Sequence, residues 1–264
     1  MPAGLGALLA SLAFVLLLRL KGIAPYETEF SSRLRQAAAF CLWVSVLALV
    51  VFWPVFSFQE HDISLIDHGA FPLLFLNHFV LALFLLLWWG FRRDETRSFE
   101  TLAAFLFLRW DRSLLRTRVL VGLFGGFVAW VATLAAVGVF AGIWLETTKT
   151  PPPEVPEVFV WIVGLSYSQK AAIILIAMTI EEAFFRAFLQ PRLGLLMSSL
   201  CFALSHFSYG LPLAVFGVFV VSLLFGLLFR WAKHLLPSIM AHGVFDAVQL
   251  FLVLPWALEH SGYL

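Results

Sequence analysis

The sequence predicts an all-α protein, a polytopic bundle of about eight transmembrane helices with both termini on the outer side. Of its 264 residues, 62% are hydrophobic and only 12% are charged, and the mean hydropathy is +0.95. A chain of this composition has too little polar surface to cover a water-soluble globule. Long apolar segments also recur along the whole chain, and basic residues collect in alternate loops between them.

Each apolar segment is compared with the length of about 20 residues that a helix needs to cross the hydrocarbon core. The first and sixth segments are shorter than this. The first lacks the basic start and the cleavage site of a signal peptide, so we expect it to be a membrane helix. We expect the sixth to be tilted, broken or reentrant within a water-filled cavity. The eight expected spans are 5–18, 37–58, 71–91, 119–145, 162 or 169–189, 195–207, 211–231 and 235–254.

The basic residues predict the orientation of these helices, because Lys and Arg concentrate in the loops on the inner side of a membrane. With eight helices and an outer N-terminus, the 17 Lys and Arg residues are divided very unevenly between the two sides of the membrane. Only Lys149 and Lys170 lie on the outer side. If one helix were omitted, basic residues would lie in loops on both sides of the membrane. The same pattern therefore supports a count of eight helices. The cationic segment 94–118, with its apolar centre 102–108, is either an interfacial amphipathic helix or an ordinary inner loop.

A proline-rich outer segment, 147–158, divides the chain into two sets of helices. Its four prolines predict an extended linker. The first set, 1–146, contains about four helices with cationic inner loops. The second set, 159–264, is the expected catalytic membrane domain, because it holds most of the ionisable residues that fall inside predicted helices.

Two other features narrow the functional classes. No basic run is interleaved with aromatic residues, so we expect no nucleic-acid partner. Cys41 and Cys201 both lie in apolar segments, where we expect them to pack rather than form a disulfide or a zinc knuckle. The spacing of Gly138 and Gly142 in the fourth span predicts close helix packing there.

Ionisable residues inside the predicted helices are the main functional signal, because each costs roughly 2.5 to 3.5 kcal/mol to insert. In the second set of helices they are Glu181, Glu182, Arg186, His206, His242 and Asp246. The first set offers only Asn77 and His78, which we expect to form interhelical hydrogen bonds.

Helix geometry separates the roles of the two adjacent glutamates. Glu182 and Arg186 are four residues apart and share one helix face, so they can form an ion pair. Glu181 points about 100° away and is free to face a cavity, which makes it the better candidate for a general base. His242 and Asp246 are also four residues apart, so their side chains can meet at one point.

These residue types allow two kinds of hydrolytic chemistry. A carboxylate and an imidazole can hold and deprotonate a water molecule, while a second imidazole with a polar neighbour stabilises an oxyanion. Alternatively, Glu181, His206 and His242 could bind a divalent metal such as zinc, which lowers the pKa of a bound water. The residues alone leave both open.

Three short motifs in order resemble those of the CAAX protease and bacteriocin-processing family of intramembrane endopeptidases. They are EExxxR at 181–186, FxxxH at 202–206 and HxxxN/D at 242–246, and the resemblance covers roughly 169–254. It implies that Glu181 and His206 activate water and that His242 and Asp246 form the oxyanion side. Glu182, Arg186 and Phe202 would then support the site, with no metal required and zinc possible.

Asp246 is a departure, because many members of this family have asparagine there and an ionised aspartate would repel an oxyanion. Three roles are therefore open to Asp246: it is protonated, it orients His242, or it binds a metal. The resemblance implies hydrolysis of a peptide bond in a membrane-anchored protein or peptide, of CAAX or C-terminal sorting type. We expect lipids as partners and a bacterial inner membrane as the location. The alternatives are a non-catalytic scaffold or immunity protein of the same fold and, less favoured, a transporter or proton relay.

Overall fold

Helices make up all the regular structure in the described part of the chain. The computed structural model describes residues 2–57, 68–92, 98–150 and 156–260. The elements are α1 (Ala3–Leu20), α2 (Pro25–Thr28), α3 (Arg33–Val46), η1 (Leu47–Phe52), α4 (Trp53–Phe56), η3 (His68–Phe75), α5 (Leu76–Phe91), α6 (Phe99–Phe105), α7 (Arg112–Thr148), α8 (Glu157–Gly164), α9 (Tyr167–Glu182), η4 (Ala183–Leu189), α10 (Gln190–Ser205), η5 (Phe207–Tyr209), α11 (Pro212–Ala232), α12 (Leu235–Val248), η6 (Gln249–Val253) and α13 (Leu254–His260). These ranges contain no strand, so the all-α class is confirmed.

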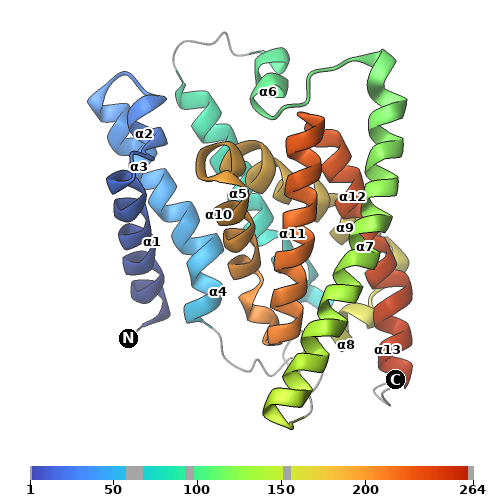
Figure 1. Cartoon of the computed structure of the whole chain (residues 1–264). Helices are drawn as coiled ribbons and strands as arrows, with labels where there is room; N and C mark the ends of the chain where they lie inside the picture. The colour runs from blue at the N-terminus through green and yellow to red at the C-terminus, as the bar shows by residue number, and fades with distance from the viewer. Residues whose placement is uncertain (1, 58–67, 93–97, 151–155, 261–264) are drawn as a thin grey trace.

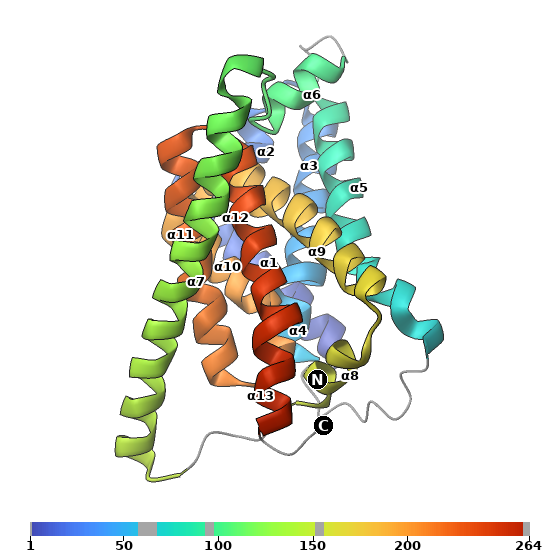
Figure 2. The same cartoon turned by 90° about the vertical axis from the view of Figure 1, so that its right-hand side faces the viewer.

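The long helices lie side by side as a bundle (Figure 1). In this view α1, α3 and α4 lie on one side, α5 and α10 in the centre, and α11, α12 and α7 on the other. Figures 1 and 2 place the start of α1 and the end of α13 at the same end of the bundle, with α6 at the opposite end. Such an arrangement is what an even number of crossings produces.

Six helical segments in the described ranges are long and apolar enough to cross a membrane. They are Ala3–Leu20, Arg33–Phe56, Phe71–Phe91, Arg112–Thr148, Pro212–Ala232 and Leu235–His260. The other two predicted spans coincide with α9 followed by η4 and with α10, and neither is among these six segments. A polytopic membrane protein is therefore confirmed, whereas the number eight and the outward termini stay predictions.

Aromatic rings join the first set of helices to the second. The ring of Phe188 on η4 lies 5.0 Å from Phe84 and 5.1 Å from Trp88, both on α5, and 5.4 Å from Trp43 on α3. These four side chains are buried. The prolines at 151–153 of the predicted linker lie outside the described residues, and the boundaries 1–146, 147–158 and 159–264 stay predictions.

A bidentate ion pair strengthens the same junction. Arg192 of α10 donates from Nε and Nη2 to the two carboxylate oxygens of Glu29, each at 2.8 Å. Trp88 also donates its indole N–H to Glu29 at 3.1 Å. Two parallel charge-assisted bonds fix both the distance and the orientation of the partners, so α5 and α10 are held in one register.

The backbone departs from regular α-helix beside several predicted functional residues. The π-helical η4 begins directly after Glu182, and all seven of its residues are buried. Gly194 has φ 81° and ψ 170° and breaks α10, which then ends at His206. This break precedes the sixth predicted span, 195–207, so the expectation that the span is tilted, broken or reentrant within a water-filled cavity stays a prediction. Within 94–118, residues 99–105 form α6, and its position relative to lipid stays a prediction.

The prediction that Gly138 and Gly142 mark close packing is wrong. A Cβ atom added at either glycine would meet no neighbouring atom of the described residues within 4 Å. Close packing occurs instead nearer the start of α7, where a Cβ on Gly126 would lie 2.6 Å from the carbonyl oxygen of Ala241 on α12. Gly122 is equally close to Pro237, at 2.7 Å from its carbonyl oxygen. Spacing alone cannot tell which stretch of a long helix has a neighbour.

Replacing Gly126 by alanine should destabilise the fold, because the new methyl group would overlap the α12 backbone. We expect a loss of about 1 to 3 kcal/mol, despite a gain of about 1 kcal/mol in helix propensity. Thermal unfolding of the purified protein in detergent measures this. Gly138→Ala is the matched control and should unfold at or above the temperature of the unaltered chain; equal melting of both variants would contradict the packing described.

Candidate active site

Four helices bring the ionisable residues together inside the bundle. Glu181 and Glu182 end α9, His206 ends α10, and His242 lies on α12. The fourth contribution is His78, near the start of α5. Glu182 is fully buried, and Glu181 and His242 are only 8% and 5% exposed.

Glu181 lies between three imidazole rings. Its Oε2 atom is 3.9 Å from Nε2 of His206 and 3.9 Å from Nε2 of His242. Its Oε1 atom is 3.0 Å from Nε2 of His78, which is a hydrogen bond. The carboxylate therefore has one oxygen engaged by His78 and the other at 3.9 Å from a nitrogen of each of the other two rings.

The protonation of His206 follows from its backbone contact. Its Nδ1 atom lies 2.8 Å from the carbonyl oxygen of Phe202 and 3.1 Å from the Ser205 hydroxyl. A carbonyl oxygen can only accept, so Nδ1 carries a proton and donates it. In the neutral ring, Nε2 is then an acceptor that faces Glu181.

Glu182 is the centre of a buried charge network. Its Oε1 atom accepts from Nδ1 of His242 at 3.1 Å, and its Oε2 atom accepts from Nε of Arg186 at 3.1 Å. Arg186 also donates to the hydroxyl of Ser222 on α11 at 3.0 Å. Its guanidinium lies 5.1 Å over the ring of Phe202. Both charged side chains of the ion pair are completely shielded, so each depends on the other.

His242 has a carboxylate at each ring nitrogen. Besides the contact of Nδ1 with Glu182, its Nε2 atom lies 3.3 Å from Oδ2 of Asp246. The ring also stacks on Phe225, with centroids 5.3 Å apart. Asp246 is thus placed to orient His242, one of the three roles open to it.

The structure brings together all seven residues that the sequence singled out: Glu181, Glu182, Arg186, Phe202, His206, His242 and Asp246. Two participants were missed as site residues. His78 does form an interhelical hydrogen bond, but nothing in the sequence indicated that Glu181 is its partner. Ser222 is a polar residue within an apolar helix, and that contrast was the only available signal.

A metal fits this arrangement poorly. Ligand atoms around tetrahedral zinc lie about 3.3 Å apart, given bonds of about 2.0 to 2.1 Å, whereas Oε2 of Glu181 is 3.9 Å from both imidazole nitrogens. In the described ranges, no group of three or more His, Cys, Asp or Glu residues has a metal-binding arrangement. We therefore derive no step through a metal, and the choice between glutamate and metal dependence stays a prediction.

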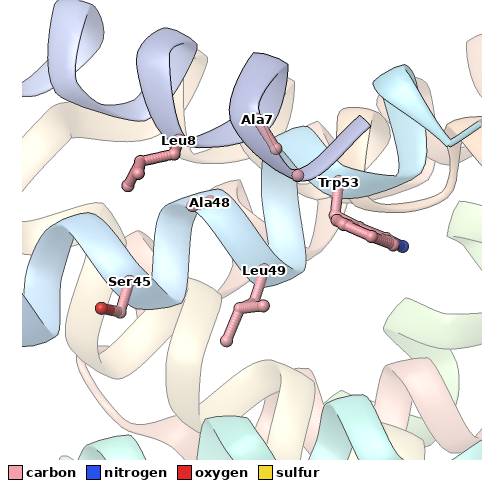
Figure 3. Close-up of a pocket in the computed structure, with 7 residues that line it drawn as sticks. Ala7, Leu8, Ser45, Ala48, Leu49 and Trp53 are labelled. Atoms are coloured by element: carbon pink, nitrogen blue, oxygen red, sulfur yellow. The ribbon is translucent and has the colours of Figure 1, made fainter. Parts of the chain in front are cut away.

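A separate cavity of about 240 Å³ lies between α1 and the α3–α4 helix (Figure 3). It is lined mainly by apolar side chains such as Leu8, Leu49 and Trp53, with Ser45 as its polar residue. None of its lining residues belongs to the glutamate–histidine cluster. This cavity suits an apolar occupant rather than hydrolysis.

The fold and the buried cluster define a helical integral membrane protein with a glutamate–histidine site. Residues 159–248 match the family model described as type II CAAX prenyl endopeptidase Rce1-like. This segment of the chain is therefore similar to that family, and it contains all seven predicted site residues.

One curated relative is the "Uncharacterized protein YpbD" of Bacillus subtilis (strain 168). It is 41% identical to this chain over 69 residues, which is 26% of this chain and 36% of YpbD. The match thus spans about a third of the relative's length. No solved structure gives a significant match to the chain.

Glu182→Gln should destabilise the protein strongly, because Arg186 would keep a buried charge without its carboxylate. Breaking such a pair costs about 3 to 5 kcal/mol, which for a chain of this size lowers the unfolding temperature by about 10 °C. The control is Glu146→Gln, which removes an exposed ion pair with Lys149 and should leave the temperature unchanged. Similar melting of the two variants would argue against the buried network.

Proposed function

We propose that the chain is an intramembrane endopeptidase that hydrolyses a peptide bond in a membrane-anchored protein or peptide. The observation that carries this proposal is the position of Glu181, whose Oε2 atom faces two imidazole nitrogens at 3.9 Å. The Rce1-like family of the surrounding segment supports the same reaction class. Because the reacting groups lie among membrane helices, a substrate held in the membrane reaches them most directly.

In the proposed reaction, a water molecule lies between Oε2 of Glu181 and Nε2 of His206. The separation of 3.9 Å allows one water to hydrogen-bond both acceptors with arms of about 2.8 Å. As its oxygen attacks the scissile carbonyl carbon, the water transfers a proton to Glu181. The carbonyl oxygen becomes an oxyanion, and Glu181 then gives the proton to the leaving nitrogen as the C–N bond breaks.

His242 is proposed as the oxyanion donor. Its Nδ1–H donates to Glu182, and Asp246 beside Nε2 can only accept when ionised. Both ring nitrogens of His242 then carry protons, which places an N–H near the reacting carbonyl. In this role Asp246 orients His242 and keeps Nε2 protonated, and the attraction of the imidazolium for the oxyanion opposes the repulsion from Asp246.

The substrate is proposed by class only, as a CAAX-type or C-terminal sorting sequence attached to the membrane. A bacterial inner membrane is the proposed location. A non-catalytic scaffold or immunity protein of the same fold is the alternative; the functional difference is whether Glu181 is needed.

Glu181→Gln should abolish peptide cleavage while leaving the fold intact. Loss of a general base lowers the rate by about 100- to 10,000-fold. Purified protein in detergent is incubated with a library of membrane-tethered peptides, with and without a strong chelator, and products are identified by mass spectrometry. Cleavage that survives the chelator but is lost in the variant supports the proposal. Loss with chelator identifies a metal enzyme, and no cleavage by well-folded protein favours the scaffold.

Asp246→Asn and Asp246→Leu should differ in activity. The asparagine side chain can accept from Nε2 of His242 through its oxygen and donate a hydrogen bond toward the oxyanion through its amide group, so we expect kcat within about tenfold of the unaltered chain. Leucine cannot orient His242, and we expect a loss of about 100- to 1,000-fold, as for removal of an oxyanion donor. If both variants were as active as the unaltered chain, Asp246 would have no part in the reaction.

A further inference from the structure

We infer that His78, on α5 of the first helix set, is a positioning residue for Glu181. This inference rests on the proposed function and adds to it a residue outside the family-matched segment 159–248. The contact that carries it is the hydrogen bond between Nε2 of His78 and Oε1 of Glu181, at 3.0 Å. The two residues are 103 positions apart in the sequence.

His78 controls where the second carboxylate oxygen of Glu181 lies. The final torsion of a glutamate side chain is soft, so a free carboxylate rotates readily. Holding Oε1 removes this freedom and leaves Oε2 at 3.9 Å from both His206 and His242. That separation is too long for a direct hydrogen bond and fits the proposed water.

Without His78, the carboxylate would be drawn toward the ring of His242, whose Nε2 atom carries a proton. A buried carboxylate gains most from direct hydrogen bonds to nitrogen donors. Movement of about 1 Å would bring Oε2 of Glu181 within bonding distance of His242. The gap would then close, and the water would lose its place. His78 thus keeps the reacting oxygen separate from its neighbours.

The position of His78 is fixed by the packing of α5. Leu81, Phe84, Leu85 and Trp88 form the buried face of this helix, and Phe84 and Trp88 contact Phe188. His78 lies three residues before Leu81, on the same face. Its side chain is only 16% exposed, whereas its neighbour Asn77 is exposed. The first helix set therefore supplies a side chain that the family-matched domain lacks.

The test compares His78→Ala, His78→Gln and Asn77→Ala in the full chain. Glutamine places an amide N–H near the position of Nε2 and should restore the hydrogen bond without an imidazole. With a cleavable membrane-tethered peptide, we expect His78→Ala to lower kcat by about 10- to 100-fold, the effect of a small misplacement of a reacting group. KM should stay within about twofold, and Asn77→Ala should change neither constant.

An infrared measurement tests the same contact without relying on cleavage. The carboxylate band of Glu181 is identified as the band lost in Glu181→Gln. It should shift in His78→Ala, return toward its original position in His78→Gln and remain unchanged in Asn77→Ala.

The outcomes separate the two proposals. An unshifted band in folded His78→Ala, or an unchanged kcat, overturns the role of His78 even if Glu181 is essential. Equal loss of kcat in the alanine and glutamine variants also overturns it, because the hydrogen bond would then not be the reason. If the unaltered chain cleaves no peptide, the proposed function fails, and the band alone decides whether His78 holds Glu181.

Discussion

The rest of the site depends on the interactions of the buried Glu182 carboxylate. An isolated charge in a low-dielectric interior is too costly to persist, so Glu182 needs partners for both of its oxygens. It finds them in His242 on α12 and Arg186 on η4. Together with the bond from Arg186 to Ser222 on α11, the network ties three separate parts of the bundle to one point.

This network also determines the direction in which the side chain of the neighbouring Glu181 points. Once Glu182 faces Arg186, helical geometry turns Glu181 about 100° away, toward a different set of helices. There it meets His206 and His242 at 3.9 Å and His78 at 3.0 Å. Two adjacent glutamates in the same helix therefore have different environments. Glu182 is paired with Arg186, whereas Oε2 of Glu181 lies 3.9 Å from two imidazole nitrogens.

The sequence predicted the all-α class and two contacts of the site, because both depend on short-range spacing. The pairs Glu182–Arg186 and His242–Asp246 follow from positions four apart on a helix, and both occur. The partner of His78 could not be predicted, since periodicity identifies a buried face but not what lies against it. The same limit explains the error at Gly138 and Gly142, which face no neighbour, while Gly122 and Gly126 contact α12. Membrane-span length was also a weak guide at α9 and α10, which are short yet hold the site.

The proposed hydrolysis within a membrane is compatible with the irregular backbone beside these two short helices. Irregular backbone at membrane depth is tolerated only where it is covered by protein or lines a water-filled cavity. Here α9 gives way to the π-helical η4 directly after Glu182, and α10 ends at His206 after its break at Gly194. π-helical turns are frequently found at functional sites. Glu181 and His206 thus lie at helix ends, whereas His242 lies within α12. Two central helices of the bundle are thus irregular. The surrounding contacts stabilise the bundle around them, and they include the Glu29–Arg192 pair and the rings around Phe188.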